Sequence, residues 1–218
     1  MADRKLAGLL AAVVVLAGCI PLSLHPFYRS RDIEFAEWLL GTWGDESEDT
    51  AFTFERADDE AYRLTVHAVS GNAQERWIFE AHLFELSDRL FLDLVRADSF
   101  DDVGERIEVD ETKLDRKALD DYVEPLCNWA FFQVPAHAFV QIKRDGDNLR
   151  YAWMDAKWIE DALDAKKVRI DHVKLADDRI LLTASTCKLR RFVKKHAGNP
   201  DAYGDWGEMR KSEPEAGQ

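Results

Sequence analysis

Apolar and polar residues alternate in many short stretches of this 218-residue chain, often on both sides of a short acidic turn. The stretches 75–86 and 89–95 alternate in this way on either side of Ser87-Asp88. Successive side chains of a β-strand point to opposite faces of the sheet, so a period of two is typical of half-buried strands. The pattern therefore predicts antiparallel strands joined as hairpins.

The same alternation recurs along the rest of the chain, and helical patterns interrupt it in the second half. Further hairpins are expected at 51–56 with 61–69, at 137–144 with 149–154, and at 168–175 with 179–183. The turn Asp145-Gly146-Asp147-Asn148 is the clearest of these signals. One helix is predicted to begin after Asp155 as its N-cap, and another to run over 186–197 until Gly198. A loop over 98–111 and a third helix over 113–122 complete the pattern.

These elements predict a mainly β (α+β) fold: an antiparallel barrel or strongly curved sheet with two or three peripheral helices. A hydrophobic content of 46% is enough for one sizeable core. We expect a single β-rich domain over residues 33–198, followed by a polar tail over 199–218.

The beginning of the chain has the pattern of an export signal. Arg4 and Lys5 precede an apolar run over 6–16, which is shorter than the roughly 20 residues of a membrane-spanning helix. The following Leu16-Ala17-Gly18-Cys19 resembles the lipobox of bacterial lipoproteins. The resemblance implies that residues 1–18 are a signal peptide and that the thiol of Cys19 is diacylated.

Lipidation of Cys19 would make residues 19–32 a lipidated tether. Two or three acyl chains hold a protein durably, since each buried CH₂ contributes about 0.8 kcal/mol. In enterobacterial lipoproteins an Asp after the cysteine favours the inner membrane, and here that residue is Ile20. The resemblance thus implies a protein of the bacterial envelope, anchored in the outer membrane and facing the periplasm.

Two further resemblances concern the folded part. The stretch Trp38 to Trp43 is similar to the lipocalins and related calycins, in which a Gly-x-Trp, here Gly41 and Trp43, opens the first barrel strand and closes one end of the barrel. The whole chain resembles a group of bacterial lipoproteins with no established activity. That group shares the early Leu-Gly-Thr-Trp and a late Leu-Thr-Ala-Ser-Thr, here Leu182 to Thr186.

Two features of the sequence suggest binding. If the sheet closes, aromatic side chains at alternating positions could line a cavity for an apolar ligand, or they could simply fill the core. These are Trp43, Phe54, Trp77 and Phe79. The expected main function is therefore a membrane-anchored, non-enzymatic binding domain for an apolar small molecule or a protein partner.

The basic helix 186–197 is the second feature. Its basic residues are Lys188, Arg190, Arg191, Lys194 and Lys195. They could dock an anionic lipid headgroup or an acidic partner, or they could form a solvated face that complements the helix C-terminus. A structural or assembly lipoprotein acting through a protein–protein surface on this helix is the alternative function.

Patterns of catalytic or metal-binding residues are not evident in the sequence. None of the six histidines lies in an HExxH or another close metal-ligand spacing, and there is no CxxC or GxSxG. We therefore expect no enzyme activity, cofactor or metal. The formal net charge of −13 argues against nucleic acid as a partner. Cys127 and Cys187 could form a disulfide or remain two separately buried thiols.

Overall fold

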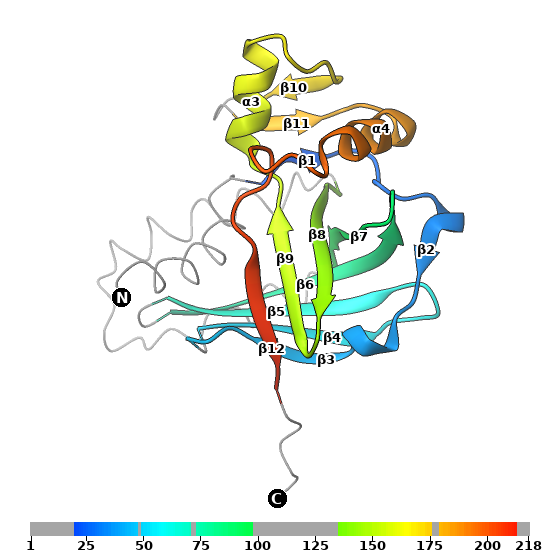
Figure 1. The fold of residues 1–218 in the computed structure, drawn as a ribbon. Helices are drawn as coiled ribbons and strands as arrows, with labels where there is room; N and C mark the ends of the chain where they lie inside the picture. The colour runs from blue at the N-terminus through cyan, green and yellow to red at the C-terminus, as the bar shows by residue number, and fades with distance from the viewer. Residues whose placement is uncertain (1–19, 48, 71–72, 98–134, 176–178, 213–218) are drawn as a thin grey trace, which may run out of the picture.

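The computed structural model describes residues 20–47, 49–70, 73–97, 135–175 and 179–212. Its centre is a closed eight-stranded antiparallel barrel, in which β12 joins β3 to β9 and β9 pairs with β8 (Figure 1). The barrel strands are β3 (Gly41–Gly44), β4 (Thr50–Arg56), β5 (Tyr62–Ser70), β6 (Ala73–Glu85), β7 (Leu90–Arg96), β8 (His137–Asp145), β9 (Asn148–Trp153) and β12 (Gly207–Lys211). The prediction of a mainly β fold, an antiparallel barrel or strongly curved sheet with peripheral helices, is confirmed, and of the two forms the sheet adopts the barrel.

Tight turns join consecutive barrel strands where the sequence indicated hairpins. Ser87 and Asp88 have positive φ angles of 56° and 60° between β6 and β7, and Gly146 has a φ of 62° between β8 and β9. Turns of this kind match the twist of the flanking strands. The pairing of Leu83 with Leu92 keeps apolar side chains of β6 and β7 on one face of the sheet.

Apolar side chains from every barrel strand meet inside the barrel in one cluster. Its buried members are Leu39, Trp43, Phe54, Tyr62, Leu64, Val66, Ala68, Trp77, Ala81, Leu83, Leu92, Leu94, Val140, Ile142, Leu149, Tyr151 and Met209. At one end the short helix η2 (Glu37–Leu39) lies against Trp43, whose Nε1 donates a hydrogen bond to the carbonyl oxygen of Leu39 at 2.8 Å. Lys211 Nζ lies 5.2 Å from the centroid of the Trp43 ring.

A second layer packs on the outer face of β6 to β9. It contains α3 (Ala156–Asp164), α4 (Thr186–His196) and the short strands β1 (Leu22–Ser23), β10 (His172–Lys174) and β11 (Ile180–Leu182) (Figure 1). The Asp155 side chain caps α3 as predicted, because its Oδ1 accepts hydrogen bonds from the backbone N–H groups of Lys157 and Trp158. Phe84, Phe91 and Phe139 from the barrel meet the two helices in this layer.

The N-terminal segment is part of the folded domain, which differs from the expected tether over 19–32. Ile20 is 8% exposed and Phe27 is 0% exposed. Strand β1 pairs with both β8 and β11, and η1 (Ser30–Asp32) and β2 (Ile33–Glu34) follow it. The described fold therefore begins at Ile20. All members of both apolar clusters lie at or after Phe27, so a chain that begins at Ile20 retains both cores.

The expected polar tail over 199–218 is wrong for its first part. Ala202 and Met209 are both 0% exposed, and β12 closes the barrel between β3 and β9. Met209 is the only residue of β12 in the inner apolar cluster, so this strand lacks the apolar alternation of the other barrel strands. Gly207 is required here, because a Cβ on it would lie 2.4 Å from Cζ of Tyr151. Residues 213–218, the loop over 98–111 and the helix over 113–122 lie outside the described residues.

Candidate functional site

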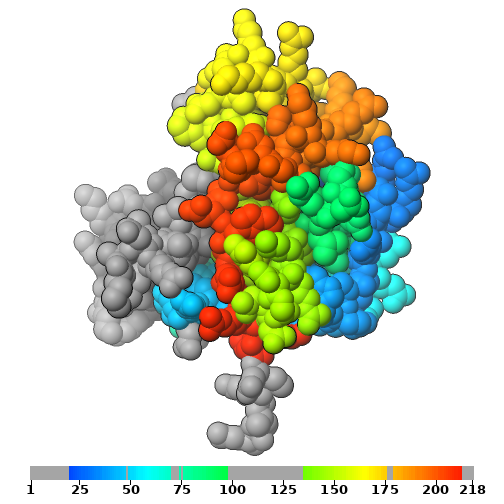
Figure 2. Space-filling view, viewed as in Figure 1, coloured from blue at the N-terminus to red at the C-terminus, as the bar shows by residue number. Residues whose placement is uncertain are grey.

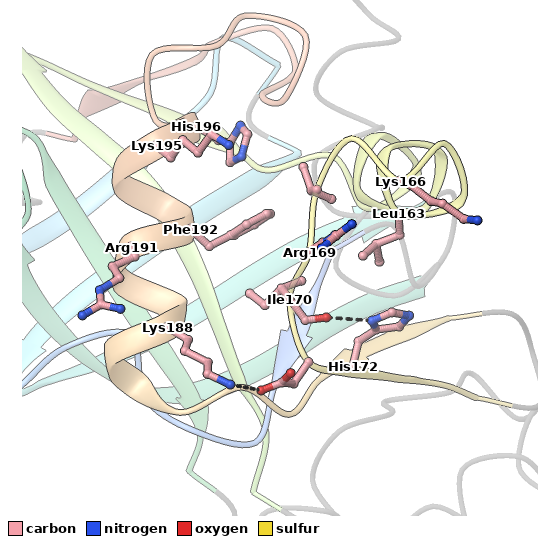
Figure 3. A pocket seen from close by; sticks show the side chains of 12 residues that line it. Leu163, Lys166, Arg169, Ile170, His172, Lys188, Arg191, Phe192, Lys195 and His196 are labelled. Atoms are coloured by element: carbon pink, nitrogen blue, oxygen red, sulfur yellow. Dashed lines mark hydrogen bonds and ion pairs between the residues drawn. The ribbon is translucent and has the colours of Figure 1, made fainter.

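A groove of about 630 Å³ lies between α4 and the connection from α3 to β10. Figure 2 shows these two parts side by side on the surface, α4 in orange and the segment around α3 in yellow. The lining residues are Leu163, Lys166, Val168, Arg169, Ile170, Asp171, His172, Lys188, Arg191, Phe192, Lys195 and His196 (Figure 3). The two walls come from segments about twenty residues apart in the sequence, which the second apolar layer holds together.

The floor of the groove is apolar. Val168 is 6% exposed and Phe192 is 7% exposed, and both belong to the outer cluster. Leu163 and Ile170 pack against the same cluster and are only partly buried. The exposed parts of these four side chains give the groove a hydrophobic base of the kind that contacts aliphatic groups of a ligand.

The rim of the groove is cationic. Lys166, Arg169, Arg191 and Lys195 are exposed, and their side chains make no hydrogen bond or ion pair with any part of the chain that the structure describes. Lys188 is the exception, since its Nζ lies 2.7 Å from Oδ2 of Asp171, the single carboxylate among the described residues that line the groove (Figure 3). Five cations against one anion make this groove strongly positive on a protein whose formal net charge is −13.

The groove also contains two histidines, His172 and His196. Burial, together with the charge of Lys195, lowers the pKa of His196, so its imidazole is neutral at pH 7. Its ring packs against Trp158 and Phe192, with centroid distances of 5.0 and 4.9 Å. His172 Nδ1 donates a hydrogen bond to the carbonyl oxygen of Ile170 at 2.9 Å.

Lys166 has a backbone conformation that favours glycine. It follows the end of α3 with a φ of 56°, and the N–H of Lys167 donates to the carbonyl oxygen of Ala162 at 2.8 Å. Helices commonly end on a left-handed residue of this kind, and glycine adopts it without a steric cost. A lysine at this position lowers the stability of the fold and places an ammonium group at the rim of the groove. Residues with a strained backbone are often found at functional sites.

Replacing Lys166 with Gly should raise the free energy of unfolding by about 0.5–1 kcal/mol, because it relieves the left-handed strain. The same change should weaken binding of anions to the groove, because it removes one rim cation. Urea unfolding followed by circular dichroism measures the first effect, and titration with an anionic ligand measures the second. Lys167→Gly is the control: Lys167 has no positive φ, so that variant should lose stability. A Lys166→Gly variant less stable than the wild type would contradict this account of the position.

Only some of the five basic residues predicted for helix 186–197 line the groove. Lys188, Arg191 and Lys195 line the groove. Arg190 instead lies on the other side of the helix, where its Nη2 is 3.0 Å from Oδ2 of Asp32 and its Nη1 donates to the carbonyl oxygen of Phe27. Lys194 is exposed outside the groove.

Sequence reasoning did not single out Lys166 and Arg169. The signal that could have found them is a short basic run, Lys166-Lys167-Val168-Arg169, in a chain with 42 acidic residues. The run lies on the connection after α3, and only the packing of α3 beside α4 brings it to the same groove as Arg191 and Lys195.

The four aromatic residues predicted to line a ligand cavity all lie on the inner wall of the barrel. Trp43, Phe54 and Trp77 are 1%, 2% and 9% exposed and belong to the inner cluster, and Phe79 packs against that cluster. The structure therefore brings them together. Within the described residues they contact one another and their neighbours across the barrel as parts of a packed core.

Of the three cysteines, only Cys187 lies within the described residues. Cys187 lies in the first turn of α4 as a free, exposed thiol, and its Sγ accepts a hydrogen bond from Nη2 of Arg29 at 3.2 Å. Cys19 and Cys127 lie outside the described residues. The expected alternative of two separately buried thiols is wrong for Cys187, which is exposed. Lipidation of Cys19 and a disulfide between Cys127 and Cys187 both stay predictions.

A buried carboxylate lies under the N-terminal segment. Asp93 is 0% exposed; its Oδ2 accepts a hydrogen bond from the Phe27 N–H at 2.8 Å and its Oδ1 lies 2.7 Å from Nδ1 of His137. Ser23 of β1 pairs with His137 in the strand register and is also 0% exposed. The His137 side chain is 14% exposed, and the hydrogen bond from the Phe27 N–H to Asp93 connects the N-terminal segment to the barrel.

Within the described part of the chain, no group of three or more His, Cys, Asp or Glu side chains could hold a metal ion. The helices that the structure describes are all too short or too polar to cross a membrane. Comparison with protein-family models, curated proteins and solved structures found no match. Among the described residues, the cationic groove combines exposed basic side chains with an apolar floor.

Proposed function

We propose that this chain is a lipid-anchored, non-enzymatic binding protein of the bacterial envelope, and that its groove beside α4 binds an anionic ligand with an apolar part. The observation that carries the proposal is a set of four cations on the groove rim that have no ion-pair partner among the described residues: Lys166, Arg169, Arg191 and Lys195. The protein has 42 acidic residues, yet of those that the structure describes only Asp171 lines this groove.

The chemistry of the groove favours a phosphate or carboxylate group attached to an aliphatic chain. Lysine ammonium and arginine guanidinium groups bind such anions through charge-assisted hydrogen bonds. The floor around Val168 and Phe192 offers apolar contact to the rest of the ligand. Within the described part of the chain, the one ion pair that an entering anion would disturb is that of Lys188 with Asp171, because the other four cations have no partner there.

The groove has stronger support as a ligand site than the interior of the barrel. Trp43, Phe54 and Trp77 are almost fully buried in one packed cluster, whereas the groove residues face solvent. Small barrels are usually filled by their own side chains. The packed interior favours a structural role for the four aromatic residues.

Octyl phosphate, kept below its critical micelle concentration, is a suitable probe of the groove. Calorimetric titration should detect its binding to residues 20–218, whereas octyl glucoside, which has the same chain but no charge, should bind far more weakly. The double variant Arg191→Gln/Lys195→Gln should lower the affinity for octyl phosphate about tenfold or more, since a hydrogen bond to a charged group contributes about 1.5–3 kcal/mol.

The matched control is Arg63→Gln/Lys194→Gln, which removes the same two charge types from exposed positions outside the groove. It should leave the affinity for octyl phosphate nearly unchanged. Equal losses in the two double variants would mean that octyl phosphate responds only to net charge, and the groove would then not be its site.

The anchor is tested separately. Cys19→Ser removes the acceptor thiol of the lipobox, so the variant should take up no fatty-acid analogue in bacterial cells that label the wild type. Both cores lie at or after Phe27, so the variant should still fold. A wild-type protein that never takes up the label would contradict lipidation and point to an ordinary signal peptide.

A further inference from the structure

We infer that the ligand of the groove is the phosphate-bearing headgroup of anionic phospholipids in the membrane that anchors the chain, so that the groove is a membrane-contact surface. The inference rests on the proposed function and narrows it to one ligand class. Three observations support it: the chain is packed from Ile20 onward, the groove lies close to that point, and the groove is positive on an acidic protein.

The first observation is the lack of a free linker after Cys19. Ile20 is 8% exposed, Ser23 is 0% exposed, and β1 is hydrogen-bonded between β8 and β11. An acyl chain on Cys19 would therefore be attached one residue before the folded domain. A protein anchored in this way stays within a few ångströms of the headgroups, because no flexible segment separates the fold from the membrane.

The second observation is the position of the groove relative to this attachment. Ser23 of β1 pairs with Leu182 of β11, and Leu182 pairs with His172 of β10, which lines the groove. Neighbouring strands lie about 4.8 Å apart, so the backbone of Ser23 is about 10 Å from that of His172. Three extended residues span about 11 Å, which places the backbone of Ile20 within about 21 Å of the groove wall.

The third observation is the distribution of charge. With a formal net charge of −13, most of the surface is repelled by an anionic membrane. The groove is the exception, because Lys166, Arg169, Arg191 and Lys195 have no partner in the described fold. Each Lys or Arg near an anionic surface contributes about 1 kcal/mol of attraction, which fades beyond a Debye length. The anchored domain should therefore turn its groove toward the headgroups.

The test uses residues 20–218, which retain both cores but not the anchor. Flotation with vesicles of phosphatidylcholine should recover little protein, and vesicles containing 30% phosphatidylglycerol should recover it in quantity. Recovery should fall about tenfold with Arg191→Gln/Lys195→Gln and remain near the wild-type value with Arg63→Gln/Lys194→Gln. Salt at 0.5 M should also release the protein from phosphatidylglycerol vesicles.

The outcomes separate the membrane inference from the proposed function. Octyl phosphate binding that depends on Arg191 and Lys195, without flotation on phosphatidylglycerol vesicles, would overturn the membrane inference and leave the proposed function standing, with a soluble anion as ligand. No binding to either probe would overturn both. Flotation that is equal in the groove and control variants would also overturn the membrane inference, because contact would then lie elsewhere on the surface.

The lipidated full chain gives an independent check of orientation. In vesicles that contain phosphatidylglycerol, amide hydrogen exchange over residues 166–172 and 188–196 should be slower than in phosphatidylcholine vesicles. Equal exchange rates in the two kinds of vesicle would contradict contact between the groove and anionic headgroups.

Discussion

Replacing Asp93 with Ala should lower the free energy of unfolding by about 3–5 kcal/mol, because it leaves a buried hydrogen-bond network without its central acceptor. Asp93 is 0% exposed and connects the Phe27 N–H, at 2.8 Å, with Nδ1 of His137, at 2.7 Å. The loss should appear in urea unfolding. Limited proteolysis should also cut the variant within residues 20–32, which the carboxylate holds against the barrel.

Two control variants test how much of the expected loss is due to the hydrogen bonds that Asp93 accepts. Asp93→Asn keeps an oxygen that can accept from the Phe27 N–H, so it should lose less stability than Asp93→Ala. Asp147→Ala removes an exposed carboxylate in the β8–β9 turn and should change stability by less than about 1 kcal/mol. A loss below about 1 kcal/mol for Asp93→Ala would mean that the N-terminal segment does not depend on this network.

Phe54→Ala should also cost about 3–5 kcal/mol, because it opens a cavity in a filled barrel. The Phe54 side chain is 2% exposed, and its ring meets that of Tyr62 edge-on with a centroid distance of 6.1 Å. Trp77→Ala, at a second position of the same cluster, should show a loss of similar size. Urea unfolding with near-ultraviolet circular dichroism reports both stability and core packing.

Phe54→Ala also distinguishes a barrel filled by side chains from a barrel with an internal cavity. In a hollow carrier, Phe54 would face a cavity, and its truncation would change ligand binding more than stability. Val69→Ala is the control, since Val69 is 38% exposed on β5 and should lose little. If Phe54→Ala lost no more stability than Val69→Ala, the barrel interior would be a cavity, and the aromatic residues would be its lining.

The hairpins could be predicted from the sequence because their determinants are local. Alternation along β6 and β7 and the polar turn at Ser87 and Asp88 lie within one short stretch. Closure of the barrel is not local. β12 offers a single inward apolar residue, Met209, and its fit depends on Gly207 leaving room for Tyr151. An alternation of apolar and polar residues cannot be recognised from one apolar residue, so the sequence predicts a polar tail where the structure has β12.

The N-terminal segment differs from its predicted role as a tether for a related reason. Pro21 and Pro26 are typical of loops, and strand β1 between them contains only two residues. Its burial comes from partners far along the chain, Leu181 and Leu182 of β11 and His137 of β8. Contacts at such sequence separations leave no periodic signal in the segment itself.

One of the two walls of the groove could be predicted from the sequence. The basic residues of α4 could be predicted because helical spacing shows which side chains share a face. The opposite wall, with Lys166 and Arg169, could not, because its position depends on how α3 and β10 pack beside α4. The backbone conformation of Lys166 is likewise invisible to pattern analysis, since most helices that end in this way have glycine there.

The most direct test of a binding site on the groove is a map of backbone amide shifts during titration. Isotope-labelled residues 20–218 would be titrated with octyl phosphate below its critical micelle concentration and followed by two-dimensional NMR. The account predicts that the perturbed amides cluster over 166–172 and 188–196, on the two walls of the groove. Perturbations confined to the inner wall around Trp43, Phe54 and Trp77, or no perturbation at all, would contradict it.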